Sequence, residues 1–147
     1  MKWLLAAALL GLAGCSSKPT TLDDFPTRPL TLPNGQKIRV ETMISDFDLL
    51  RGMMYRTSLA TDRGMLFVHA APDRYKSWMY QTLIPLDIIW MDANRTIVEI
   101  VPNAPPCKTK ASQCPQYGGD VLSSYTLEIP AGMARKFGLQ VGETLQW

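Results

Sequence analysis

The stretch QTLIPLDIIWMD, residues 81–92, is the most apolar segment after the N-terminus, and it contains one carboxylate near its centre, Asp87. Alternate residues of a strand face opposite sides, and here the residues on both sides are apolar. A strand of that composition is covered on both faces, as in the interior of a sheet. We therefore expect Asp87 to be shielded from bulk water.

An enclosed carboxylate needs compensation, because an ionised acid in apolar surroundings is costly unless it is paired and hydrogen-bonded. Asp87 is expected to have a basic or multi-donor partner, to become neutral through a raised pKa, or to line a pocket. The composition does not select the partner, since five arginines are available: Arg51, Arg56, Arg63, Arg74 and Arg95.

Strands dominate the elements predicted around this segment. Pro33-Asn34-Gly35 has the composition of a tight turn and predicts a hairpin that continues with a strand at 37–42. Further strands are predicted at residues 64–68, 78–82, 86–92, 96–101 and 123–129, with a last one after Gly142. Residues 70–77 and 103–120 are expected to be loops.

Two short helices complete the prediction. Ser45 and Asp48 form a capping-box pattern at the start of the first helix, and Phe47, Leu50 and Met54 are expected to face the core. The second helix is predicted at 131–138, with Gly138 ending it. Since strands outnumber helices, we predict a mostly β fold of the β-rich α+β class: a compact barrel-like or curled sheet with two short helices.

Residues 1–14, MKWLLAAALLGLAG, are expected to lie outside the fold. Lys2 precedes an apolar run of about ten residues, which is too short for a permanent membrane span and suits a signal peptide. Small residues then lead to Cys15. This order resembles a bacterial lipoprotein signal, and the resemblance implies that Cys15 is lipidated and becomes the first residue of the mature protein.

The segment 15–29 is polar, contains Pro19, Pro26 and Pro29, and is predicted to be the lipidated cysteine with a flexible tether of roughly 45 Å. One globular domain is predicted at 30–147. Two or three lipid chains would hold the chain stably on a membrane. We therefore expect an exported, lipid-anchored protein, on the periplasmic face of the outer membrane if the cell is Gram-negative.

Charge and cysteine content narrow the function classes. The 15 basic and 13 acidic residues are scattered, so no concentrated basic face for nucleic acid is expected. Cys107 and Cys114 are an even pair, which in an oxidising compartment favours a disulfide. A zinc site would need four ligands, and a redox pair would favour C-x-x-C. No metal or cofactor is predicted.

Several motifs follow one another in a recognisable order: GMMYR (52–56), RGMLFV (63–68), IPLDI (84–88), LEIPAG (127–132) and GLQVGE (138–143). Together they resemble the bacterial and archaeal family called domain of unknown function 192, over roughly residues 36–147. The resemblance implies a small β-rich domain, often exported or lipid-anchored. It implies no established activity.

By the same resemblance, the polar signature of the family falls on Arg56, Thr82 and Asp87, with Trp78 and Met79 beside them. The chain departs from the family twice. The usual W-M-K-N-T reads WMYQT (78–82) here, so a mechanism that needs a lysine at position 80 is not expected. His69 also replaces the usual aromatic residue after the GMLFV strand.

We hypothesise that Arg56 and Asp87 form a buried or half-buried pair near Thr82 and Trp78. The pair is either a structural clamp or part of a pocket, in which Arg56 holds an anionic group and Trp78 or Tyr117 stacks on a ligand. The predicted function is that of a membrane-anchored domain that binds a small ligand or an envelope protein. The alternative is an enzyme that uses Asp87 as acid or base and Arg56 as anion anchor; the sequence names no catalytic residue beyond that.

Overall fold

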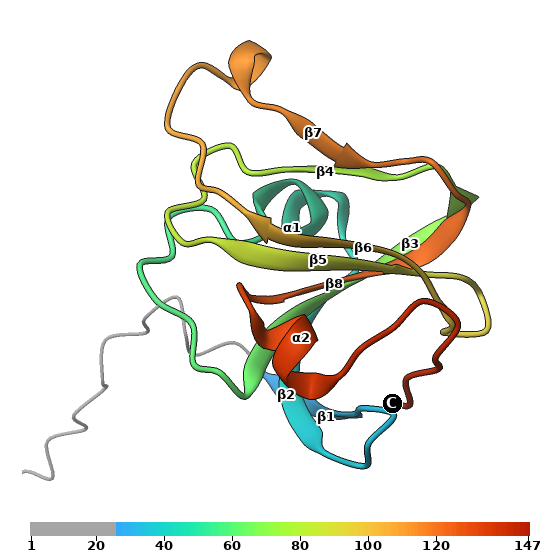
Figure 1. Ribbon diagram of the computed structural model, residues 1–147. Helices are drawn as coiled ribbons and strands as arrows, with labels where there is room; N and C mark the ends of the chain where they lie inside the picture. Colours follow the sequence, from blue (N-terminus) through green and yellow to red (C-terminus); the bar gives the residue numbers. More distant parts are fainter. Residues whose placement is uncertain (1–25) are drawn as a thin grey trace, which may run out of the picture.

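The structure is a computed structural model that describes residues 26–147. Within this range six strands form one sheet, in the order β1-β2-β3-β8-β5-β6, and β4 and β7 form a separate ribbon (Figure 1). The strands are β1 (Thr27–Thr31), β2 (Lys37–Met43), β3 (Arg63–Asp73), β4 (Lys76–Trp78), β5 (Leu86–Met91), β6 (Ile97–Ala104), β7 (Gln116–Gly118) and β8 (Ser123–Pro130). The helices are α1 (Asp46–Arg51), α2 (Met133–Phe137) and the 3₁₀ turn η1 (Ala111–Gln113).

The predicted β-rich α+β class is confirmed, and the sheet is curled without closing into a barrel. β1 and β6 are its two edges, and β2 and β3 are its parallel pair among the described strands. At one end the C-terminal segment forms bridges to both sides, with Gln146 beside Thr31 and Thr144 beside Thr96. Of the two forms that the prediction named, barrel-like or curled, the curled sheet is the one observed.

The N-terminal hairpin forms as predicted, with Leu30 of β1 opposite Ile38 of β2. Gly35 has a φ of +83° in the turn, a conformation that residues with a Cβ rarely adopt. β1 begins at Thr27, so residues 27–29, which the sequence assigned to the tether, belong to the sheet. The predicted signal peptide, Cys15 and the rest of the tether lie outside the described residues.

The main sheet has two buried faces. On one face Leu127 and Ile129 of β8 pack with α2 and the C-terminal segment. On the other face, Ile88 and Trp90 of β5 lie in a second apolar cluster, under α1 and the β4–β7 ribbon (Figure 1). Because side chains alternate along a strand, the polar residues Thr126 and Glu128 of β8 point to this second face.

The α1 helix begins as predicted and packs differently. The Ser45 side chain accepts a hydrogen bond from the backbone N–H of Asp48, as the capping pattern indicated. Phe47 and Leu50, which we expected to face the core, are 69 % and 64 % exposed. The helix ends at Gly52 after six residues, so a stripe over two turns does not form.

The segment 103–120, predicted as a loop, contains η1 and β7, and β7 pairs with β4. The Cys107–Cys114 disulfide is confirmed, with a Cα–Cα distance of 5.8 Å. A Cβ placed on Gly118 of β7 would lie 2.5 Å from the Trp90 ring, so the ribbon lies directly on the sheet. Helices long and apolar enough to span a membrane are not found in the described part of the chain.

Candidate functional site

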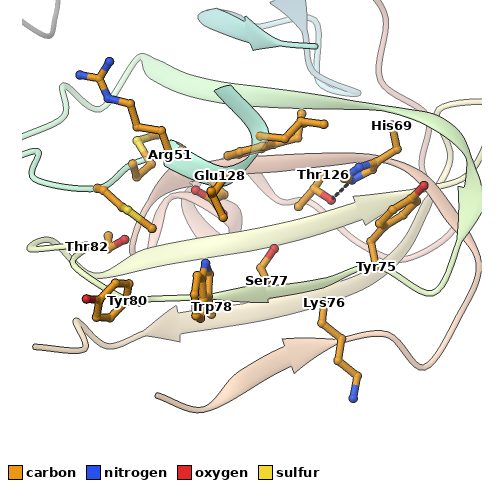
Figure 2. A pocket seen from close by; sticks show the side chains of 16 residues that line it. Arg51, His69, Tyr75, Lys76, Ser77, Trp78, Tyr80, Thr82, Thr126 and Glu128 are labelled. Atoms are coloured by element: carbon orange, nitrogen blue, oxygen red, sulfur yellow. Dashed lines mark hydrogen bonds between the residues drawn. The ribbon is translucent and has the colours of Figure 1, made fainter. Parts of the chain in front are cut away.

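A cavity of about 230 Å³ lies between α1, the β4 strand and the second face of the main sheet. Its walls combine apolar, aromatic and polar side chains (Figure 2). The chemically active groups among them are Arg51, His69, Tyr75, Lys76, Ser77, Trp78, Tyr80, Thr82, Thr126 and Glu128.

Glu128 is the acidic residue of this cavity. It lies on β8 between Met65 of β3 and Ile88 of β5, so both neighbours across the sheet are apolar. The residue is 6 % exposed, and its side chain points into the cavity (Figure 2). The carboxyl group is thus buried in the sheet and open to a ligand from one side.

Burial raises the pKa of the Glu128 carboxyl from 4.5 to about 8. Desolvation is the cause, and no charge or hydrogen bond from the described residues offsets it. A carboxyl with this pKa is mostly protonated at pH 7, when it can donate a hydrogen bond as well as accept one. Shifts of this kind in a cavity are typical of functional groups, although structural carboxylates also show them.

Aromatic rings line the side of the cavity opposite Glu128. The Trp78 and Tyr80 rings lie with centroids 5.3 Å apart and planes tilted by 40°. The chain reaches this position because β4 ends at Trp78, after which Tyr80 bridges to Cys107. The disulfide loop therefore supports the segment that carries both rings.

His69 and Thr126 close another side of the cavity. His69 Nε2 lies 3.1 Å from Thr126 Oγ1, and its ring stacks on Tyr75 with centroids 3.6 Å apart (Figure 2). Burial lowers the pKa of His69 below its ordinary value, so the imidazole is neutral at pH 7. His69 is thus a neutral hydrogen-bonding group held in place by two contacts.

The prediction that Arg56 and Asp87 form a pair is wrong. Asp87 is fully buried, as expected, but it lies on the opposite face of the sheet, toward α2. Its two oxygens accept hydrogen bonds from the backbone N–H groups of Asn103 and Ala134, each at 2.8 Å. A multi-donor partner therefore compensates the charge, and the donors are backbone amides in place of a guanidinium.

Arg56 instead binds Glu41 of β2. Its Nη1 donates to Glu41 Oε1 at 2.8 Å, and its Nη2 donates to Glu41 Oε2, so the contact is bidentate. Both side chains are buried. Neither Asp87 nor Arg56 lines this cavity, so the structure does not bring together the two residues on which the alternative enzyme prediction depended.

The remaining predicted residues divide between the cavity and the core. Trp78 and Thr82 line the cavity, and Thr82 forms a bridge to Met54. Tyr117 is on β7 opposite Ser77, packs against the second apolar cluster and does not line the cavity. The predicted group thus contributed two of its five members to the site.

Sequence reasoning missed Glu128, although a signal was present. In SSYTLEI the polar residues Ser124, Thr126 and Glu128 alternate with apolar ones, which is also the pattern of a strand with a solvated face. In the sheet that face is covered by α1 and the ribbon. Among the described residues, groups of three or more His, Cys, Asp and Glu side chains that could hold a metal are not found.

Comparison with known proteins places this geometry in a family. Residues 30–147 match DUF192, described as "Uncharacterized ACR". A solved structure of a candidate transcription regulator from Sinorhizobium meliloti 1021 is 28 % identical, with a TM-score of 0.71, over 80 % of this chain and 89 % of that chain. A solved structure of a protein of unknown function from Novosphingobium aromaticivorans DSM 12444 is 27 % identical, with a TM-score of 0.75. The match covers 95 % of this chain and 100 % of that chain. None of the curated proteins matches the chain in sequence.

Proposed function

The chain belongs to the DUF192 family, and on that premise we propose that it is a lipid-anchored domain of the cell envelope that binds a small ligand in the Glu128 cavity. One observation carries the ligand site: a buried carboxyl without a hydrogen-bond partner among the described residues points into a cavity of about 230 Å³. A purely structural carboxyl is normally hydrogen-bonded, as Asp87 is in this molecule.

The size of the cavity favours a small molecule over a protein partner. Drug-sized ligands occupy clefts of roughly 300–1,000 Å³ lined by apolar and aromatic side chains with a few polar groups. This cavity has the same kind of lining and is somewhat smaller. An envelope protein would need a broader surface, of roughly 800 Å² on each partner.

Export and anchoring are supported by two features of the chain. The sequence around Cys15 resembles a lipoprotein signal. The Cys107–Cys114 disulfide is of the kind that persists in oxidising compartments such as the periplasm. Both features suit a domain held on the outer face of a membrane, and on the periplasmic face of the outer membrane in a Gram-negative cell.

Native mass spectrometry of the full chain, purified from its own membranes, tests the ligand site. We expect a bound small molecule that is absent from Ser77→Phe, in which the new ring fills the cavity. Ser112→Phe, on the exposed η1 turn, is the matched control and should retain the bound mass. The proposed site is refuted if the wild-type chain carries nothing, or if both variants retain the same mass.

Metabolic labelling with a palmitate analogue tests the anchor separately. The wild-type chain should take up the label and sediment with membranes, and Cys15→Ser should do neither. An unlabelled wild-type chain would remove the anchor from the proposal and leave the cavity unaffected.

A further inference from the structure

The charged side chains around the cavity differ in whether they face its interior. Glu128 points into it, whereas the Arg51 guanidinium and the Lys76 ammonium, which also border it, both extend away from Glu128 (Figure 2). His69 is neutral at pH 7, because burial lowers its pKa. The interior of the cavity thus holds one potential negative charge, and the side chains that line it direct no cation toward that charge.

The aromatic wall has the geometry that attracts a cation. Ring faces carry negative electrostatic potential, and a cation within about 6 Å of a ring centroid is attracted by roughly 0.5–2 kcal/mol. The Trp78 and Tyr80 rings are 5.3 Å apart and tilted, so they form a corner and not a flat stack. Met53 and Met54 add polarisable sulfur atoms to the same lining.

We infer that the ligand is a small organic cation, an amine or a quaternary ammonium group, that lies between the Glu128 carboxylate and the Trp78 and Tyr80 rings. This inference rests on the proposed function, because it names the ligand class of the same cavity. The cavity of about 230 Å³ has room for a group of this size. A neutral polar ligand would use Glu128 only as a hydrogen-bond partner and would gain less from the aromatic corner.

Binding of a cation should be coupled to proton release. The ligand favours the ionised carboxylate, so at pH 7 the protonated Glu128 must lose its proton when the cation binds. The other titratable or charged side chains around the cavity are Arg51 on α1, His69 on β3, Lys76 on β4, and Tyr75 and Tyr80 beside β4. Measuring binding over the same pH range in His69→Asn separates the titration of His69 from that of Glu128.

Isothermal titration calorimetry with choline and with its neutral isostere 3,3-dimethylbutan-1-ol tests the inference on the full chain. The two probes have the same shape, and only choline carries the charge. We expect choline to bind at least tenfold more tightly, and its affinity to rise as the pH increases from 6 to 8, by up to tenfold per pH unit. The same rise is expected in His69→Asn.

Two substitutions, each with a matched control, locate the site. Glu128→Gln should weaken choline binding at least tenfold at pH 8, whereas Glu99→Gln, on β6 outside the cavity, should not. Trp78→Leu should weaken binding similarly, whereas Trp147→Leu, which lies against Tyr125 elsewhere, should leave it unchanged.

The outcomes distinguish the inference from the proposed function. The neutral isostere could bind as tightly as choline or more tightly, and lose this binding in Trp78→Leu. That result would refute the inference that the ligand is a cation, and the proposed binding cavity would remain. Choline binding that Glu128→Gln does not change also overturns the inference. If neither probe binds and native mass spectrometry finds no bound mass, the inference and the proposed function fail together.

Discussion

Glu41 and Glu128 lie on the same face of the sheet, on either side of Met65. Of these two carboxylates, only Glu41 forms an ion pair with a described residue, Arg56. The register places Glu41 of β2 beside Met65 of β3, and Met65 beside Glu128 of β8. Since neighbouring strands are about 4.8 Å apart, the Cα atoms of Glu41 and Glu128 are roughly 10 Å apart. Arg56 neutralises Glu41, and Glu128 faces the cavity. The same face of one sheet therefore holds a structural carboxylate and a candidate functional one.

Glu128→Gln should stabilise the fold at neutral and alkaline pH. The pKa of Glu128 is raised to about 8 in the folded chain from 4.5, so the folded state binds the extra proton between these values. Stability from this group is fully present below pH 4.5 and is lost as pH rises through 8, at up to about 1.4 kcal/mol per pH unit. Glutamine removes this loss.

Urea denaturation of wild type and Glu128→Gln from pH 5 to pH 8.5 measures the difference. His69 is common to both proteins, so its titration cancels. The stability difference should be small at pH 5 and grow toward pH 8. A difference that stays constant with pH would show that the carboxyl is hydrated in the folded chain.

Asp87→Asn should destabilise the fold by about 2–4 kcal/mol, because a buried charge-assisted acceptor is lost and an amide N–H₂ then faces a backbone donor. Asp87 joins the start of α2 to β5 through Ala134 and joins the end of β6 through Asn103. Choline binding should be unchanged, since Asp87 is on the other face of the sheet. Asp92→Asn, in the β5–β6 turn, is the matched control and should cost less than about 1 kcal/mol.

Arg56→Met should cost about 3–5 kcal/mol, because it leaves the Glu41 carboxylate buried without its bidentate partner. Adding Glu41→Gln should recover more than half of this loss, since no buried charge then remains unpaired. A double-mutant cycle by equilibrium denaturation gives the coupling energy. A coupling below about 0.5 kcal/mol would indicate that solvent screens the pair.

Replacing both Cys107 and Cys114 by serine should lower stability by roughly 2–3 kcal/mol, as expected for a short closed loop. The loop supports Tyr80 through the bridge at Cys107 and the β7 strand beside β4. Choline affinity should therefore fall as well, and calorimetry on the double variant measures it. Full affinity in that variant would show that the aromatic corner is held without the disulfide.

Local patterns predicted the turns and helix ends better than the strand bounds. The loop predicted at 70–77 contains the end of β3 and the start of β4, and the strand predicted at 78–82 ends at Trp78. The Pro33-Asn34-Gly35 turn, the Ser45 cap and the C-terminal Gly138 of α2 all depend on neighbours within a few residues, and each formed as expected. The burial of Asp87 followed from its apolar neighbours on both sides. The exposure of Phe47 and Leu50 could not be foreseen, because it depends on where α1 ends relative to the sheet.

The candidate site required information that is not local. The partner of Asp87 could be a backbone amide anywhere in the chain, and the spacing of charged residues does not indicate it. Glu128 became a candidate only when β8 was placed between β3 and β5, which turned an alternating polar face inward. Strand order thus decided which carboxylates were paired and which were not.

The bridges from Gln146 to Thr31 and from Thr144 to Thr96 have a consequence for biogenesis. The ribosome makes residues 144–146 after all the strands that they join, so these bridges cannot form during the synthesis of the sheet. The sheet therefore lacks these two bridges until residues 144–146 have been made.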